Sequence, residues 1–198
     1  MMVITMKKNT TNFTNSIPGG FAWLNEPEEY RTDDTGLVIT VEPDTDFWQR
    51  THYGFRRDNG HCLLTELSGD FTMTLRCGFE YSEQYHQAGI MLYIDTENWI
   101  KASIEYEDER FSRLGSVVTT LGYSDWATTD IPSGRKEMWY RMQKQKTDCI
   151  IESSTDGKQW VQMRLAHLHA DAGSVRAGLY ACSPGKKSFT ARFDYVQV

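Results

Sequence analysis

One short segment, from Asp46 to Gly60, combines large aromatic side chains with arginine, histidine and aspartate. Its sequence, DFWQRTHYGFRRDNG, fits neither a helical period nor a clean strand, because both faces of an extended chain would mix apolar and polar side chains. Sugar sites combine flat aromatic rings with charged and polar groups that bind hydroxyls. The segment therefore indicates a ligand site, with Phe47 and Phe55 as core anchors. The side chains expected to face the ligand are Trp48, Arg50, His52, Tyr53 and Asp58.

A second group of aromatic and polar residues lies on a predicted β-hairpin, from His86 to Tyr106. The alternating apolar residues, among them Ile90 and Ile104, predict that one face of each strand packs in the core. The two opposite faces would then lie side by side. The run from Met138 to Gln145 predicts a third strand with a similar outward face. The outward residues that join the candidate site are Gln87, Tyr93, Trp99, Lys101, Glu105, Trp139 and Arg141.

The chain that positions these residues is predicted to be mostly β, since short alternating runs bounded by turn residues recur along its length. We expect a flexible tail over residues 1–16 and a single domain over residues 17–198, with the segment Leu121–Arg135, which contains Trp126, as a long ordered loop. Two stacked antiparallel sheets of the jelly-roll kind suit this pattern. Further strands are predicted at Leu37–Val41, His61–Leu67, Phe71–Glu80, Phe111–Thr120, Asp148–Ser154, Trp160–Ala166, Val175–Cys182 and Ser188–Val198.

Composition excludes several classes of partner. The 198 residues are 39% hydrophobic and 24% charged, which is typical of one ordinary globular domain. The net charge of −6 disfavours nucleic acid, and no apolar run is long enough to span a membrane. The first residues lack the apolar core of a secretory signal, and the four widely spaced cysteines are typical of buried, reduced thiols. We therefore expect a cytoplasmic protein without nucleic-acid or membrane partners.

Several local patterns together resemble one known family. They are TDFWQRTHYGFRRDNGH from Thr45, QAGIMLYIDTENWIK from Gln87, SSTDGKQW from Ser153 and the closing FDYVQV from Phe193. In this order they resemble the domain-of-unknown-function family whose fungal members are called regulators of enolase. The resemblance implies the concanavalin A-like lectin/glucanase superfold, a curved sandwich with a concave face, and related modules are appended to some bacterial β-xylosidases. The name of the fungal members implies a protein-binding regulator.

Three functions stay open for this chain. The favoured one is a non-catalytic binding module that holds a carbohydrate or small sugar derivative on the concave face. Exposed Trp, Tyr and Arg also dominate protein interfaces, so a protein partner fits the same residues. In a further alternative the face carries only solvated cross-strand ion pairs, such as Lys101 with Glu105, and binds no ligand.

The third function, glycoside hydrolysis, requires two carboxylates on one face. Glu105 and Glu107 are two residues apart, and the run EYEDE is similar to the E-x-D-x-E signature of glucanases with this fold. Glu109, however, stands beside Arg110 where a turn is expected. We interpret the run as a charged hairpin tip and keep Glu105 and Glu107 as catalytic candidates only within this alternative.

Metal and cofactor chemistry finds little support in the sequence. His167 and His169 share one side of an extended segment, but only Asp171 lies near enough to add a third ligand. The chain has no C-x-x-C pair, no Asp-rich and Asn-rich calcium loop, and no G-x-S-x-G motif. We therefore expect no metal site and no cofactor.

Overall fold

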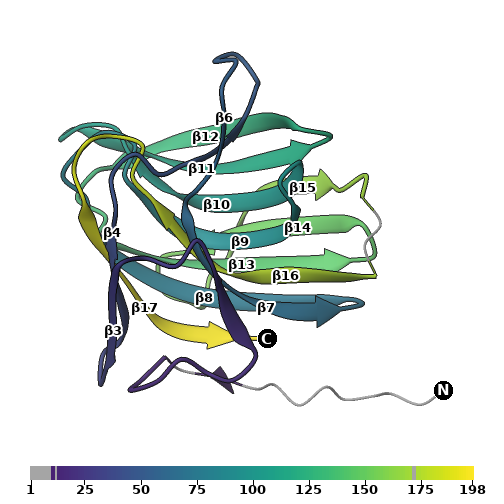
Figure 1. Ribbon diagram of the computed structural model, residues 1–198, viewed down its shortest axis with the longest axis horizontal. Coiled ribbons are helices and arrows are strands. Elements are labelled where there is room, and N and C mark those ends of the chain that lie inside the picture. Colours follow the sequence, from purple (N-terminus) through teal and green to yellow (C-terminus); the bar gives the residue numbers. More distant parts are fainter. Residues whose placement is uncertain (1–9, 12, 171–172) are drawn as a thin grey trace.

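The computed structural model describes residues 10–11, 13–170 and 173–198, and these form two large antiparallel sheets stacked face to face (Figure 1). The all-β class and the two-sheet sandwich are thus confirmed. Sheet A runs β15 (Val161–His167), β14 (Asp148–Ser154), β13 (Glu137–Gln145), β8 (Phe71–Glu80), β17 (Phe189–Gln197), β4 (Gly36–Val41) and β3 (Glu29–Asp33), with β1 (Thr10–Thr11) also paired to β17. Sheet B runs β12 (Tyr123–Pro132), β11 (Phe111–Thr120), β10 (Asn98–Tyr106), β9 (Gln87–Asp95), β16 (Ser174–Cys182), β7 (His61–Ser68) and β2 (Phe21–Leu24).

The main core fills the space between the two sheets. Alternate residues of the β9–β10 hairpin point inward, so that Ile90 and Ile104 are fully buried, as the alternation predicted. Tyr140 of β13 is also fully buried and belongs to the same cluster. Burial of this apolar surface is the main force that holds the sheets together. The four cysteines are buried and unpaired, which confirms the interpretation of reduced thiols.

The segment Leu121–Arg135 is not the loop that we expected. Ten of its residues form β12, which pairs with β11 in unbroken register from Tyr123 opposite Thr120 to Pro132 opposite Phe111. β12 is an edge strand with mostly exposed side chains, so it lacks the apolar alternation by which buried strands are found. The prediction of a loop was wrong for this reason.

The expected tail also contributes to the fold. Thr10 and Thr11 pair with the last strand, β17. Phe13 is 1% exposed and packs edge-on against Phe21, with ring centroids 5.6 Å apart. Ordered structure therefore begins before Ile17, whereas residues 1–9 and 12 lie outside the described part of the chain.

The segment from Asp46 to Gly60 forms a small hairpin of its own, β5 (Phe47–Gln49) and β6 (Arg56–Asp58). In Figure 1 this hairpin rises beyond β11 and β12 at one end of the sandwich. Its apolar side chains pack on the outward face of sheet B and form a second hydrophobic cluster, separate from the main core. The buried members of this cluster are Phe47, Trp48, Cys62, Leu64, Met91, Tyr93, Trp99, Val117, Tyr180 and Cys182.

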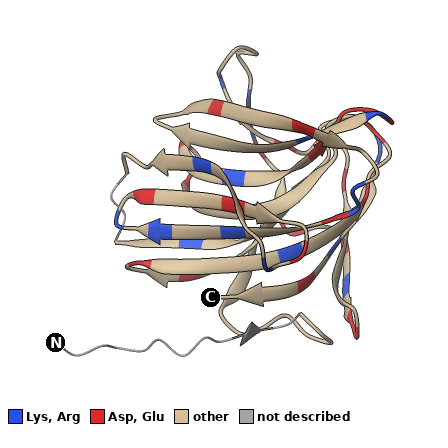
Figure 2. Ribbon diagram, turned by 180° about the vertical axis from the view of Figure 1, so that it is seen from behind, with Lys and Arg blue, Asp and Glu red and all other residues tan. Residues whose placement is uncertain are grey.

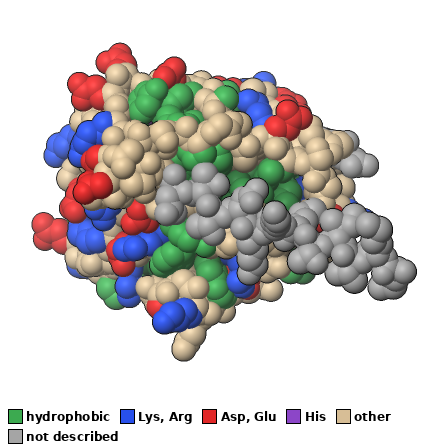
Figure 3. All heavy atoms as spheres, turned by 90° about the horizontal axis from the view of Figure 1, so that it is seen from below, with side chains coloured by type: hydrophobic (Ala, Val, Ile, Leu, Met, Phe, Trp, Pro, Cys, Tyr) green, Lys and Arg blue, Asp and Glu red, His purple; other side chains and the backbone are tan. Residues whose placement is uncertain are grey.

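Charged residues are spread over the strands and turns of both sheets (Figure 2). At the end opposite the β5–β6 hairpin, charges of both signs are interspersed with hydrophobic side chains (Figure 3). No helix in the described part of the chain is long and apolar enough to cross a membrane.

Candidate functional site

A pocket of about 370 Å³ lies between the β5–β6 hairpin and the outward face of sheet B. This is within the range in which proteins hold small ligands. The hairpin supplies one wall, β9 and β10 supply the polar floor, and β11 and β12 supply further apolar side chains. The lining residues are Asp46, Trp48, Tyr53, Phe55, Arg57, Tyr85, Gln87, Lys101, Glu105, Val117, Trp126 and Pro184.

Gln87 is the centre of the polar floor, and its amide is fully engaged. Its Oε1 accepts hydrogen bonds from Nζ of Lys101 at 2.9 Å and from the hydroxyl of Tyr180 at 3.3 Å. Its Nε2 donates to the carbonyl of Tyr85 at 3.2 Å and to Oε2 of Glu105 at 3.0 Å. A glutamine amide can accept two hydrogen bonds and donate two. Gln87 therefore positions its neighbours and has no capacity left for a ligand.

Lys101 is a buried cation, 3% exposed, in the middle of this floor. Its Nζ lies 3.7 Å from Oδ1 of Asp46 and 5.8 and 5.6 Å from the ring centroids of Trp99 and Tyr180. The ion pair and the two aromatic faces offset part of the cost of burying the ammonium group. Asp46 is held in turn, because its Oδ1 accepts a hydrogen bond from the backbone N–H of Phe47 at 2.7 Å.

Glu105 is the titratable group of the floor. Burial raises its pKa from 4.5 to about 7, and the carboxylate of Asp46 acts in the same direction. The ammonium of Lys101 lowers the pKa without cancelling this effect. Near neutral pH the Glu105 side chain is therefore present both as an acid and as a carboxylate, so it can donate or accept a hydrogen bond.

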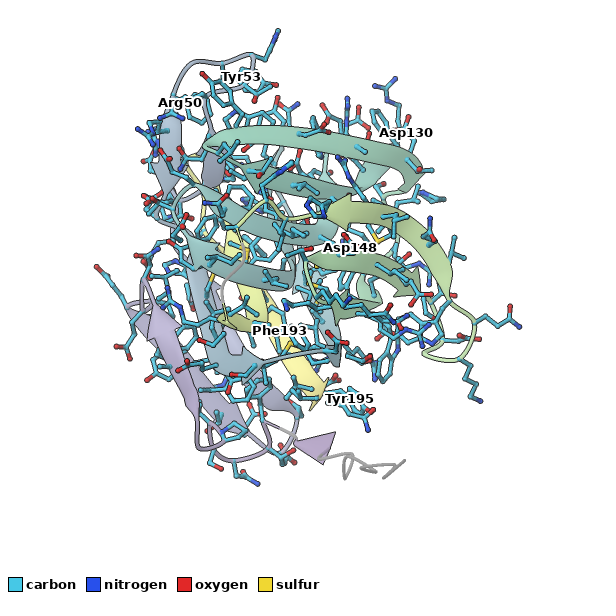
Figure 4. All side chains as sticks on the ribbon, turned by 90° about the vertical axis from the view of Figure 1, so that its right-hand side faces the viewer. Arg50, Tyr53, Asp130, Asp148, Phe193 and Tyr195 are labelled. Atoms are coloured by element: carbon cyan, nitrogen blue, oxygen red, sulfur yellow. The ribbon has the colours of Figure 1, made fainter. Side chains whose placement is uncertain are left out.

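The aromatic wall comes from the tip of the hairpin. Tyr53 stacks on Phe55 with an interplanar angle of 20° and packs edge-on against Trp48 at 5.6 Å. The backbone of the tip is left-handed at Arg50 (φ 56°) and at His52 (φ 63°), a conformation that side chains other than glycine adopt rarely. Such strain is often found at functional loops. Figure 4 shows Arg50 and Tyr53 at this projecting end of the molecule.

Hydrogen bonds fix the hairpin to sheet B. The guanidinium of Arg50 donates to the carbonyl of Gly122 at 2.9 Å and to Glu97 at 3.2 Å. Arg56 also binds Glu97, and it donates to the side chain of Gln49 at 3.0 Å. The wall of the pocket is thus tied to both turns at this end of the sheet.

The structure brings part of the predicted site together. Arg50 supports the hairpin, and the ring of His52 packs on Tyr53 at 4.8 Å, while Asp58 is exposed on β6. Tyr93 and Trp99 are 4% and 0% exposed beneath the hairpin, so they form its base and do not line the pocket. The predicted residues that do line the pocket are Trp48, Tyr53, Gln87, Lys101 and Glu105.

Trp139 and Arg141 are not at this pocket. They lie on β13 of sheet A, where Trp139 packs on Tyr195 at 4.9 Å and Arg141 binds Glu152 at 2.6 Å. Tyr195 and Tyr53 lie at opposite ends of the molecule in Figure 4. Alternation within one strand shows which residues share a face, but it does not show to which sheet the strand belongs.

The remaining chemical candidates are also separated from the pocket. Glu107 binds Arg113 at 2.9 Å and Gln84 at 2.5 Å, in the turn between β10 and β11. This placement confirms the charged hairpin tip. Nδ1 of His167 donates a hydrogen bond to Oδ1 of Asp148 at 2.7 Å, and the ring packs on His169, whereas Asp171 lies outside the described residues. The described residues contain no cluster of three or more metal-ligating side chains.

Sequence reasoning missed several residues of the pocket. Phe55 was expected in the core but is 43% exposed, so that prediction was wrong, whereas Phe47 is fully buried as predicted. Asp46 begins the aromatic segment and could have been included on that signal. Trp126 was noted only as part of an expected loop. The other residues that the prediction omitted are Arg57, Tyr85, Val117 and Pro184.

Residues 23–198 match the family described as "Protein of unknown function (DUF1349)". The chain belongs to this family. "Regulation of enolase protein 1" of Saccharomyces cerevisiae is 36% identical over 172 residues, which are 87% of this chain and 85% of the relative. The match confirms the family resemblance that the local patterns indicated.

Solved structures support the sandwich fold of this DUF1349 protein. The crystal structure of a functionally unknown protein from Saccharomyces cerevisiae has a TM-score of 0.83 and 34% identity, and the match covers 90% of this chain and 96% of that one. The GH43 protein BlXynB of Bacillus licheniformis has a TM-score of 0.74 at 16% identity, over 95% of this chain and 38% of that one. At such low identity the second likeness shows the fold alone.

Proposed function

We propose that this protein is a non-catalytic binding module for a carbohydrate or a small sugar derivative. The main support for this proposal is the pocket of about 370 Å³ between the β5–β6 hairpin and sheet B. It joins aromatic walls, including Trp48 and Trp126, to a floor that bears Lys101 and Glu105. Aromatic rings that stack and buried polar groups that bind hydroxyls are what a sugar ring requires. The sandwich it shares with the GH43 protein is compatible with this function.

A thermal-shift screen of the full-length protein tests the proposal. Neutral monosaccharides and disaccharides, uronic acids and sugar phosphates are compared, because a ligand that binds only the folded state raises the melting temperature. Trp48→Ala removes a wall of the pocket, and Trp160→Ala is a matched control, since Trp160 stacks on Arg141 of sheet A. The proposal predicts a shift that Trp48→Ala abolishes and Trp160→Ala retains. A flat response to every sugar would reject it.

A second candidate is a protein partner. Tyr53 and Phe55 are 57% and 43% exposed at the hairpin tip, and exposed aromatic residues often dominate protein interfaces. The name of the yeast relative suggests enolase as the partner to test. Calorimetry with purified enolase and with the double variant Tyr53→Ala, Phe55→Ala distinguishes the two candidates. Binding of enolase that the double variant loses would favour the protein partner.

A further inference from the structure

The floor of the pocket leaves a defined set of hydrogen-bonding groups free. Of the three N–H donors of Lys101, only one is engaged in a hydrogen bond with a described residue, Gln87. Oδ2 of Asp46 and Oε1 of Glu105 accept no hydrogen bond within the described part of the chain. Because Gln87 is saturated, a ligand would meet a cationic donor flanked by two carboxyl groups.

The charges of this set select against ionic ligands. A phosphate or carboxylate ligand would be attracted by Lys101 and Arg57 but repelled by Asp46 and by the ionised form of Glu105. A cationic amino sugar would be attracted by the carboxylates but repelled by Lys101. An uncharged hydroxyl group suits both, because its oxygen can accept from the ammonium while its hydrogen is donated to a carboxylate.

We propose that Asp46, Lys101 and Glu105 bind two adjacent hydroxyl groups of an uncharged sugar. Both hydroxyl oxygens accept N–H bonds from Lys101, and their hydrogens are donated in opposite directions, one to Asp46 and one to Glu105. The inference rests on the proposed function and narrows it to neutral sugars with a vicinal diol. Gln87 is the positioning residue, since it holds both Lys101 and Glu105.

The aromatic walls support a ring-shaped ligand at this diol. Trp48, Tyr53 and Phe55 approach the pocket from the hairpin, whereas Trp126 reaches it from β12. The apolar C–H faces of a pyranose or furanose ring can pack against these side chains while its edge hydroxyls reach the floor. An acyclic polyol would present the same diol but would lose more conformational entropy on binding.

The ligand can be varied without changing the protein. Isothermal titration of the wild-type protein compares glucose, galactose, mannose and xylose with glucuronate, glucose phosphate and glucosamine. The tightest neutral sugar is then compared with its monodeoxy derivatives. Loss of either hydroxyl of the bound pair is expected to weaken binding about tenfold or more, because hydrogen bonds to charged groups are strong. The charged sugars are expected to bind more weakly than their neutral parents.

A matched pair of variants tests the protein side. Lys101→Met keeps the length of the side chain and removes the ammonium group, and it should lower the affinity at least about tenfold. Lys144→Met is the control, since Lys144 is also buried, at 8% exposure, but lies on β13 of sheet A. Melting curves of both variants show whether they fold. If Lys101→Met does not fold, the deoxy sugars still decide the question in the wild-type protein.

The outcomes separate the inference from the proposed function. Neutral sugars that bind and lose affinity on deoxygenation and in Lys101→Met would support both. Sugars that bind equally well to Lys101→Met, or a uronate or phosphate that binds tightest, would overturn the diol inference and leave a sugar-binding module. Absence of binding by every sugar would overturn both.

Discussion

The backbone N–H of Gln49 donates a buried hydrogen bond to Oγ of Ser124, 2.9 Å away and 75 residues later in the chain. The same hydroxyl lies 2.7 Å from Oγ1 of Thr119. Ser124 therefore joins the β5–β6 hairpin to β12 and β11, and the position of the pocket wall depends on a strand that sequence alternation does not identify.

We predict that Ser124→Ala loosens the hairpin. The substitution leaves the N–H of Gln49 without its acceptor in a buried place, so the free energy of unfolding should fall by about 1–3 kcal/mol. Hydrogen exchange should become faster in residues 47–58, and urea unfolding should give the loss of stability. Ser112→Ala is the control, because Ser112 of β11 is equally buried but its hydroxyl bonds to no described residue. Equal effects of the two substitutions would contradict the anchoring role.

A pair of phenylalanines separates support of the hairpin from contact with the ligand. Phe47 is fully buried between Trp99 and Tyr180, at centroid distances of 5.8 and 6.4 Å. Phe47→Ala should therefore cost about 3–5 kcal/mol of unfolding free energy through the cavity it leaves. Phe55→Ala should cost less than about 0.5 kcal/mol, because its side chain is 43% exposed, and it should weaken sugar binding instead. Denaturant unfolding and titration of both variants decide this, and a stability loss at Phe55 as large as at Phe47 would refute the assignment.

The contrast between these two residues shows what the sequence could predict. Alternation located most strands of the sandwich, because their inward faces are apolar, but it missed β2, β3 and β12. It failed at Phe55, since the left-handed residues Arg50 and His52, together with Gly54 (φ 75°), reverse the direction of the chain and break the two-residue period. Tyr85 was missed for a different reason. It precedes β9 in a turn, and only the packing of the distant hairpin makes it part of a pocket.

The raised pKa of Glu105 predicts a pH-dependent stability. Below pH about 4.5 both the folded and the unfolded states carry the proton, so Glu105 has no effect. Between pH 4.5 and about 7 the unfolded state releases the proton while the folded state keeps it, so the free energy of unfolding falls as the pH rises. The penalty is complete only at a pH well above 7, where the folded state has also released the proton.

Glu105→Gln should remove this penalty. Relative to the wild type, the variant should gain up to about 3 kcal/mol of unfolding free energy between pH 4 and pH 8, an upper limit set by the size of the pKa shift. Chemical unfolding at several pH values measures the difference. Glu80→Gln is a suitable control, because Glu80 is exposed on β8 of sheet A and lies outside the pocket. A constant difference between wild type and Glu105→Gln across this range would show that the Glu105 carboxyl titrates normally.

The separation of the two glutamates also bears on catalysis. Retaining and inverting glycosidases place one carboxyl group on each side of the same scissile bond. Glu105 lines the pocket, but Glu107 is held in the β10–β11 turn by Arg113 and Gln84. The pocket holds a second carboxylate, Asp46, but we assign Asp46 and Glu105 to hydrogen bonds with ligand hydroxyls. We therefore predict that the purified protein does not hydrolyse aryl glycosides or xylo-oligosaccharides above the rate of a Glu105→Gln, Asp46→Asn double variant. The variant removes both carboxylates of the pocket floor, so contaminating activity would persist in it. Hydrolysis by the wild type that disappears in the double variant would contradict the prediction and establish an enzyme.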